Sequence, residues 1–327
     1  MTKAAPSCWV ISDGRRGIEN QALGLAEALH RQAPITIQPF HVLQGTVFKA
    51  ASPKLQSALK PRPQDYGLPS SPPDMVIGCG RQAIAPLLAI KKAWPQSFTA
   101  YVQDPRMNPA LFDLVIAPAH DRLAGPNVET MIGSPNRVTR DLIAAETLKF
   151  ADRLNALPMP RAAFLIGGPS GRYDFTDKDG KAHIEAAKTL LAAGHSLLVS
   201  ASRRTPDKVK SMWQELAKAH ENIWFYSGAD SEPNPYFAFL GGGDMILVSE
   251  DSTNMLTEAA STGKAVFRLP LSGDAGKFAL LYEALEARCG AARWQGQLYG
   301  GDYVALDETT RMAEIFWARF KASRLDS

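Results

Sequence analysis

The sequence predicts an α/β protein made of two Rossmann-like domains, each with a parallel sheet. Short apolar runs alternate with amphipathic helical stretches, and this alternation stops and then restarts near Ala162. Repeated strand–helix units imply parallel sheets, because parallel neighbours need a crossover connection. The length of 327 residues agrees, since it corresponds to about two domains.

The first series of strand–helix units is expected between residues 8 and 117. Strands are predicted at 8–12, 35–40, 75–78, 98–102 and 114–117, with helices at 21–32 and 81–93. Each predicted strand is short and lacks charged residues. This is typical of strands that helices cover on both faces.

The second series begins at a predicted strand over 162–166. Further strands are expected at 196–200, 223–226, 245–248 and 265–269, and helices at 178–193, 206–219, 234–240, 253–262 and 277–287. Thr176 and Asp179 have the spacing of a capping box. Thr205 and Pro206 are a suitable N-cap and first helical residue for the helix that follows them.

The polar, Pro-containing stretch 150–160 separates the two series and predicts the domain boundary. We therefore expect an N-terminal domain over 1–155 and a C-terminal domain over 156–305. A last helix is expected within 306–327, where it carries Ile315, Phe316, Trp317 and Phe320. These side chains need a surface to bury them, so we expect this helix to pack back on the N-terminal domain.

Composition excludes several classes of protein. Hydrophobic residues make up 45% and charged residues 21%, and the net charge of +3 is too balanced to argue for nucleic-acid binding. Cys8, Cys79 and Cys289 form no CxxC pair, and the histidines form no HExxH motif, so neither a metal site nor a cofactor is expected. No apolar run reaches the length of a membrane helix or signal peptide. We expect a cytoplasmic protein.

One segment, 31–62, contains no acidic residue. Its charges are Arg31, Lys49, Lys54, Lys60 and Arg62. One interpretation is a long surface excursion with a small helix. The other is a surface that approaches anionic lipid at the inner membrane or an anionic acceptor. We favour the first, because five cations spread over this length make a weak patch.

Three loops of the second domain are candidates for a binding site, because ligands of open parallel sheets bind beyond the carboxyl ends of the strands. The GGPSG loop presents backbone amides that suit an anion, and the SRRTP loop places guanidinium groups before a helix N-terminus, which suits a diphosphate. A glutamate on the helix after SEDSTN could accept hydrogen bonds from ribose hydroxyls. The candidate binding residues are Gly167, Gly168, Ser170, Ser202, Arg203, Arg204, Ser249, Asp251, Ser252, Asn254 and Glu258.

Each of these residues also has a structural interpretation. The glycines suit a turn, the arginines a solvated surface, and Asp251 or Ser252 an N-cap. In the first domain, Asp13 is a candidate general base, and Asp104 and His120 are further candidates. All three also suit turns. Cys79 has no identifiable histidine partner, so we expect a packed thiol.

The chain resembles the Elm-type mitochondrial-fission family, whose bacterial members are often labelled predicted nucleoside-diphosphate-sugar epimerases. The resemblance rests on four motifs: CWVISDGRRGIENQALGLAEAL, GGPSGRY, SASRRTP and NPYFAFLGGGDMILVSEDSTNMLTEAASTGKAV. It covers about residues 8–270, and the joint occurrence of SRRTP and EDSTNMLTEA is its most specific part. Plant members are implicated in recruiting a dynamin-related GTPase to mitochondria.

More distantly, the second half is similar to the donor domain of two-domain nucleotide-sugar glycosyltransferases, such as the peptidoglycan N-acetylglucosaminyl transferase. Glu258, Gly263 and the strand at 265–269 match a ribose-binding glutamate, a glycine and a buried strand. The resemblance implies a glycosyltransferase-B-like fold whose two sheets face each other across a cleft.

Three functions follow as hypotheses. The first is a glycosyltransferase-like protein that binds a nucleotide-sugar in its second domain and a lipid-linked or saccharide acceptor in its first, without a metal, in envelope polysaccharide or glycolipid synthesis. Here Asp13 would deprotonate the acceptor. The second is a non-catalytic adaptor, and the third is a nucleotide-sugar epimerase or hydrolase.

Overall fold

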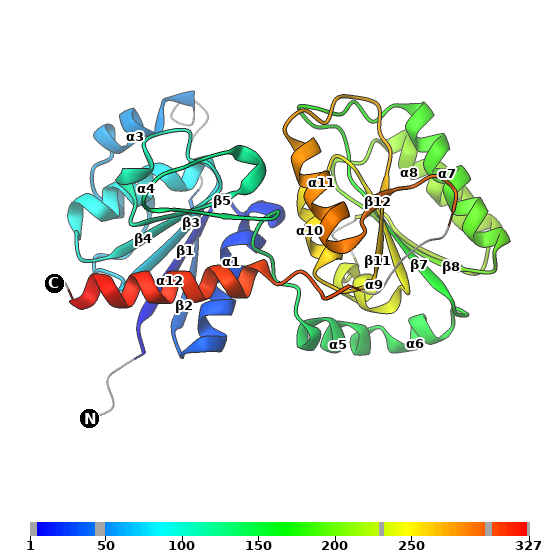
Figure 1. The fold of residues 1–327 in the computed structure, drawn as a ribbon, viewed down its shortest axis with the longest axis horizontal. Helices are drawn as coiled ribbons and strands as arrows, with labels where there is room; N and C mark the ends of the chain where they lie inside the picture. Colours follow the sequence, from blue (N-terminus) through cyan, green and yellow to red (C-terminus); the bar gives the residue numbers. More distant parts are fainter. Residues whose placement is uncertain (1–4, 43–49, 229–231, 298–302, 326–327) are drawn as a thin grey trace. The chain divides into compact units, whose positions relative to one another are not determined.

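A computed structural model describes residues 5–42, 50–228, 232–297 and 303–325. The chain forms two compact units. Unit 1 comprises Met1–Arg137 together with Asp307–Ser327, and unit 2 comprises Val138–Leu306. Each unit contains a six-stranded sheet in which every neighbouring pair of strands is parallel, which confirms the predicted α/β class (Figure 1).

The sheet of unit 1 has the order β2-β1-β3-β4-β5-β6. Its strands are β1 (Ser7–Ser12), β2 (Thr36–His41), β3 (Met75–Cys79), β4 (Phe98–Val102), β5 (Leu114–Pro118) and β6 (Val128–Met131). Successive side chains of a strand point to opposite faces. In β1, accordingly, Cys8 and Val10 join one buried cluster, and Trp9 and Ile11 join another.

Helices cover both of these clusters. Helices α1 (Arg16–Gln32) and α12 (Glu308–Leu325) contribute to the first cluster, and α4 (Arg81–Ala93) contributes to the second. Helix α12 packs along α1, where the Trp317 indole donates to the Leu29 carbonyl at 3.0 Å (Figure 1). The ring of Phe316 lies edge-on to Phe98, with centroids 5.1 Å apart. The last helix therefore belongs to the core of unit 1.

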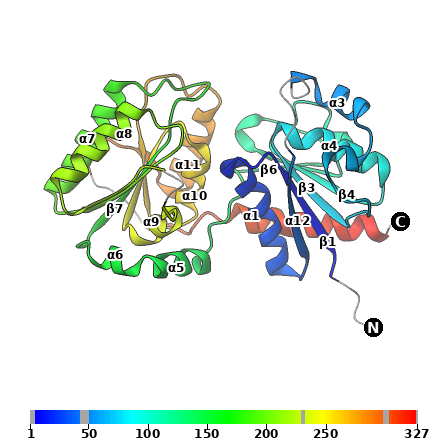
Figure 2. The ribbon, with the colours of Figure 1, turned by 180° about the vertical axis from the view of Figure 1, so that it is seen from behind.

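The sheet of unit 2 has the order β12-β11-β10-β7-β8-β9. Its strands are β7 (Arg161–Ile166), β8 (Ser196–Ala201), β9 (Ile223–Tyr226), β10 (Met245–Ser249), β11 (Ala265–Leu269) and β12 (Ala292–Arg293). Its helices include α7 (Asp177–Ala192), α8 (Asp207–Ala219), α9 (Tyr236–Gly242), α10 (Thr253–Ala260) and α11 (Phe278–Cys289). They flank the sheet on both sides (Figure 2).

Two short helices, α5 (Arg140–Lys149) and α6 (Ala151–Asn155), were not expected. None of the residues of α5 is buried, so its sequence has no apolar stripe that would reveal a helix. Helix α5 packs on α9 at Gly241, where a Cβ would collide with Thr147. Because both helices belong to unit 2, the change of unit falls between Arg137 and Val138, before the predicted boundary at 150–160.

The segment 31–62 begins in the last residues of α1 and contains the short helix α3 (Pro53–Leu59), and Lys49 lies outside the described residues. Leu55 and Leu59 on this helix are exposed. None of the described helices is long and apolar enough to cross a bilayer.

Each sheet has a switch point, where the chain reverses its direction across the sheet. In unit 2 the chain runs from β7 outward through β8 and β9, and it returns to β10 on the other side of β7. In unit 1 the same reversal separates β1 from β3. Ligands of such sheets bind outside the carboxyl ends of the strands at this point.

Phe316→Ala is expected to destabilise the protein by about 3–5 kcal/mol, because the ring is fully buried between α12 and the sheet. Leu325→Ala on the same helix is the control, since Leu325 is exposed and its loss should change stability by less than about 0.5 kcal/mol. Urea denaturation measures both changes. Equal midpoints for the two variants would show that α12 does not stabilise unit 1.

Candidate functional site

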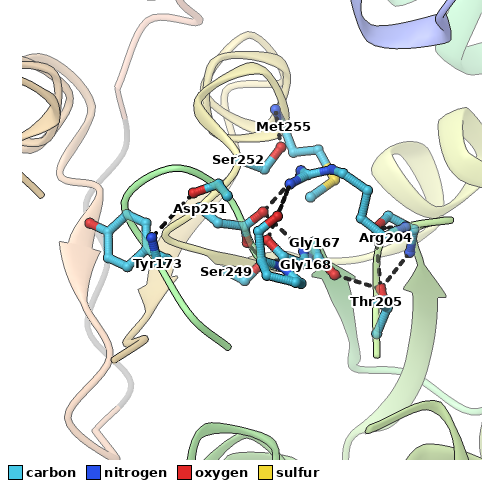
Figure 3. A network of polar contacts seen from close by, with 12 residues as sticks. Gly167, Gly168, Tyr173, Arg204, Thr205, Ser249, Asp251, Ser252 and Met255 are labelled. Atoms are coloured by element: carbon cyan, nitrogen blue, oxygen red, sulfur yellow. Dashed lines mark hydrogen bonds and ion pairs between the residues drawn. The ribbon is translucent and has the colours of Figure 1, made fainter. Parts of the chain in front are cut away.

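The carboxylate of Asp251 lies at the centre of the polar network at the switch point of unit 2 (Figure 3). Asp251 is buried, with 6% of its surface exposed, and its carboxylate accepts three hydrogen bonds. The donors are the Gly168 amide at 3.0 Å, the Ser249 hydroxyl at 2.7 Å and the Arg204 guanidinium at 3.0 Å. These contacts join the loops that follow β7, β8 and β10.

Glycine is required after β7 because the backbone approaches other groups closely there. A Cβ on Gly167 would collide with the carboxylate of Asp251, and one on Gly168 would collide with the Arg204 carbonyl. The amide of Gly167 donates to the Ser249 hydroxyl at 2.7 Å. The amides of Gly167 and Gly168 are thus already paired within the protein. Our prediction that they bind a diphosphate is not supported by this arrangement, because Asp251 supplies the anion.

Thr205, which was expected to cap the next helix, connects the loop after β8 to the loop after β7. Its hydroxyl accepts from the Ser202 amide at 2.9 Å and lies 2.5 Å from the Gly167 carbonyl. The N-cap of α8 is Pro206, so the expected capping by Thr205 is wrong. The Ser202 hydroxyl accepts from the Arg204 amide at 3.1 Å, which fixes the turn. The Thr176–Asp179 capping box forms as expected.

Two arginines follow β8, and they differ in their environment. The guanidinium of Arg204 is half-exposed and donates to the carbonyls of Gly168 and Pro169 as well as to Asp251. Arg203 is exposed. Burial raises the pKa of Asp251, and the hydrogen bonds from Gly168 and Ser249 and the charge of Arg204 oppose this rise. The half-exposed Arg204 thus pairs with the buried Asp251, while the neighbouring Arg203 is exposed to solvent.

Helix α10 begins directly after this network. Ser252 is its N-cap, and the Ser252 hydroxyl accepts from the Met255 amide at 3.4 Å. Asn254 lies in the first turn. The first amides of a helix have no intrahelical acceptor, and the helix dipole makes this end positive. Ser170 is exposed on the facing loop, where its hydroxyl accepts from the Arg172 and Tyr173 amides at 3.3 Å.

Glu258 lies on α10 and is 7% exposed. Its pKa is raised to about 7, because the effect of burial outweighs the hydrogen bond from the Tyr236 hydroxyl, which acts to lower the pKa. Tyr236 begins α9 and was not expected at the site. The sequence motif NPYFAFL around it reads as an ordinary apolar helix, so nothing marked its hydroxyl as a partner of Glu258.

A cavity of about 230 Å³ is lined by Glu250, which precedes Asp251 in the sequence, and by Tyr173 and Tyr282 among others. The two tyrosine hydroxyls are 2.8 Å apart, and Tyr282 donates to the Glu250 carbonyl at 2.6 Å. The buried carboxylate of Glu250 pairs with Arg293 at 3.0 Å. None of these residues was predicted to belong to a site.

In unit 1, Asp13 lies at the switch point between β1 and β3. Its carboxylate accepts from the amide and Nε of Arg15 at 3.2 and 2.8 Å and from Gln82 at 3.2 Å. Burial favours a raised pKa, but these hydrogen bonds and the charge of Arg15 outweigh it, so the pKa of Asp13 is lowered. A carboxylate stabilised in this way is a weaker general base.

The other candidates of unit 1 follow neighbouring strands. Asp104 accepts from the Arg106 amide at 2.7 Å, which is the geometry of a turn. His120 is buried, and its Nε2 lies 3.7 Å from Asp121. Cys79 is fully buried, and burial raises the pKa of its thiol. Among the described residues, no group of three or more His, Cys, Asp or Glu side chains could hold a metal ion.

Gly167→Ala is expected to destabilise unit 2 by about 1–3 kcal/mol, because the added methyl group would displace Asp251. Gly171→Ala, in the same loop, is the matched control. A Cβ there meets no atom within 4 Å, so its stability should change by less than about 0.5 kcal/mol. Thermal unfolding tests both variants, and a harmless Gly167→Ala would contradict the close approach.

Comparisons with known proteins agree with this fold. A family model described as Mitochondrial fission ELM1 matches residues 16–320. The Mitochondrial fission protein ELM1 of Arabidopsis thaliana is 28% identical over 241 residues, a match that covers 66% of this chain and 56% of that protein. The chain thus spans little more than half of that relative. Protein RP120 of Rickettsia prowazekii (strain Madrid E) is 26% identical over 303 residues, covering 79% of this chain and 82% of the relative.

Three solved structures share the fold at low sequence identity. UDP-GlcNAc 2-epimerase from Methanocaldococcus jannaschii is 12% identical, with a TM-score of 0.53 over 95% of this chain and 99% of the other. The Neisseria meningitidis epimerase bound to UDP-GlcNAc is 14% identical, with a TM-score of 0.52 over 96% and 92%. ADP-heptose LPS heptosyltransferase II of E. coli is 12% identical, with a TM-score of 0.50 over 97% and 99%. By its match along nearly the whole sequence, the chain belongs to the mitochondrial fission ELM1 family.

Proposed function

We propose that the chain binds a nucleotide-sugar at the carboxyl edge of the sheet of unit 2. One observation carries the proposal: at the switch point, the N-terminus of α10 follows the Asp251–Arg204 network, and Glu258 lies on the same helix. A positive helix end and a guanidinium suit a diphosphate, and a carboxylate suits ribose hydroxyls. The epimerase and heptosyltransferase structures, whose names contain nucleotide-sugars, share the fold.

In this proposal the diphosphate contacts the first turn of α10, with Ser252 and Asn254, and the side chains of Arg203 and Arg204. Gly167 and Gly168 do not bind the diphosphate in this proposal, although their amides were expected to do so. Gly167 and Gly168 allow Asp251 to approach, and Asp251 orients Arg204. The site is thereby formed before the ligand binds, so little ordering is required on binding.

Glu258 recognises the ribose. An ionised carboxylate accepts hydrogen bonds from two hydroxyls, while a protonated one must donate one of its own. Tyr236 already donates to one carboxylate oxygen, so it holds the carboxylate in a fixed orientation for the sugar.

The reaction we propose is glycosyl transfer. An acceptor hydroxyl bonds to the anomeric carbon, the bond from that carbon to the diphosphate breaks, and a base takes the hydroxyl proton. The positive end of α10 and Arg204 stabilise the leaving nucleoside diphosphate. We assign the saccharide or lipid-linked acceptor to unit 1, with Asp13, Asp104 and His120 as the candidate bases.

A second candidate is a nucleotide-sugar-binding protein without catalysis. It is favoured by the geometry of unit 1, where the Asp13 carboxylate is engaged by Arg15 and Gln82 and its pKa is lowered. Incubation with UDP-GlcNAc, followed by proton NMR, separates the candidates. Epimerisation or hydrolysis changes the sugar signals without an acceptor, transfer changes them only with one, and a binding protein leaves them unchanged.

Nucleotide-sugar affinity is expected to increase as the pH rises from 6 to 8. The pKa of Glu258 is raised to about 7, so the carboxylate is mostly protonated at pH 6 and mostly ionised at pH 8. Isothermal titration with UDP, GDP, ADP and CMP sugars measures this. Glu258→Gln should bind at least about tenfold more weakly at pH 8, the loss expected for a charge-assisted hydrogen bond, and should lose the pH dependence.

Glu215→Gln is the matched control, since Glu215 is an exposed residue of unit 2 that pairs with Lys218. It should bind like the unaltered protein at both pH values. Absence of binding with all four nucleotide classes would rule out the proposed function.

A further inference from the structure

Unit 2 has a second candidate binding site, a groove of about 490 Å³ bordered by α5 and α6. Its lining includes Arg161, which begins β7, and Lys264, which precedes β11. The groove therefore lies at the amino ends of the strands. The nucleotide-sugar site is at their carboxyl ends, so the two sites share no residue.

Aliphatic side chains form much of the groove. Ile143 and Leu148 of α5 and Leu154 of α6 line it, together with Ala144 and Ala151. Leu148 is 75% exposed, and none of the ten residues of α5 is buried. This helix packs on α9 with one side and leaves apolar surface uncovered on the groove side. A volume of this size is within the range of small-ligand sites, roughly 300–1,000 Å³.

The charges around the groove are all positive. Arg140, Arg161 and Lys264 line it, and no carboxylate is among its described lining residues. Lys264 is already engaged, because its ammonium donates to the carbonyls of Leu240, Gly241 and Gly243 at 2.5–2.8 Å. The Nε of Arg161 donates to the Leu157 carbonyl at 3.0 Å, and among the described residues this is the one hydrogen bond of its guanidinium.

Arg140 differs from these two cations. It is exposed, and within the described part of the chain no hydrogen bond or ion pair involves its guanidinium. The groove therefore offers guanidinium donors at its polar end and aliphatic surface along its length. Guanidinium groups bind phosphate and carboxylate groups as paired donors.

We propose that this groove binds an amphipathic organic anion, with an aliphatic chain against α5 and α6 and a phosphate or carboxylate near Arg140 and Arg161. A small ligand fits better than an anionic membrane. The outer surface of α5 and α6 carries both signs of charge, with Asp141, Glu146 and Asp152 beside Lys149 and Arg153. Such a surface gives little net attraction to anionic lipid.

Octyl phosphate is a suitable probe, with octanoate, octanol and inorganic phosphate as companions, each titrated by calorimetry. Octyl phosphate or octanoate should bind more tightly than both octanol and phosphate, and the stronger of the two identifies the head group. Arg140→Gln and Leu148→Asn should each weaken binding of that probe by about tenfold, since they remove a charged donor or apolar contact.

Two matched variants serve as controls. Lys149→Gln removes a cation of α5 that does not line the groove, and Met159→Asn removes an exposed apolar side chain outside it. Both should bind the probe normally. The proposal would be overturned if neither octyl phosphate nor octanoate bound, or if octanol bound with the same affinity. It would also be overturned if Arg140→Gln and Leu148→Asn left the affinity for the probe unchanged. Binding only to vesicles that contain phosphatidylglycerol would overturn it too.

The result is independent of the proposed nucleotide-sugar site. Glu258→Gln should leave octyl phosphate binding unchanged, and Arg140→Gln should leave nucleotide-sugar binding unchanged. Failure of one site therefore does not imply failure of the other.

Discussion

The buried carboxylate of Asp251 is the contact on which the geometry of unit 2 most depends. A carboxylate removed from water is costly unless donors surround it, and here an amide, a hydroxyl and a guanidinium do so. Each donor comes from the end of a different strand or its loop. Hydrogen bonding to this one carboxylate thus holds three loops together at the switch point. The Thr205 hydroxyl adds a further contact between the loops after β7 and β8.

The sequence was enough to predict the two sheets, because ten of the twelve strands match short apolar runs between predicted helices, and of these runs only 265–269 contains a charged residue, Arg268. It was not enough for α5, β6 or β12. Helix α5 has no buried residue, β6 has four residues with a glutamate among them, and β12 has two residues, so none of the three leaves a clear apolar pattern. The loops of the candidate site were also predictable, since they follow strands. Their roles were not, because glycine amides pair equally well with a phosphate or with a carboxylate of the same chain.

The two ends of the sheet of unit 2 differ in their chemistry. At the carboxyl ends, strands lead into polar loops and helix N-termini, which suit anions that carry many hydroxyl groups. At the amino ends, the C-terminus of α9 is satisfied by Lys264, and apolar side chains of α5 remain beside it. Parallel topology produces this asymmetry, because every strand enters at one edge and leaves at the other.

The pairing of Asp251 with the Gly168 amide has a consequence for how the protein could change over evolution. A loop held by an internal anion keeps its shape whether or not a ligand is present. Selection that preserves the shape of this loop is then separate from selection on the residues that contact a ligand. Family members could therefore alter or lose their ligand while Gly167, Gly168 and Asp251 persisted, and such a triplet would mark common ancestry more reliably than common activity.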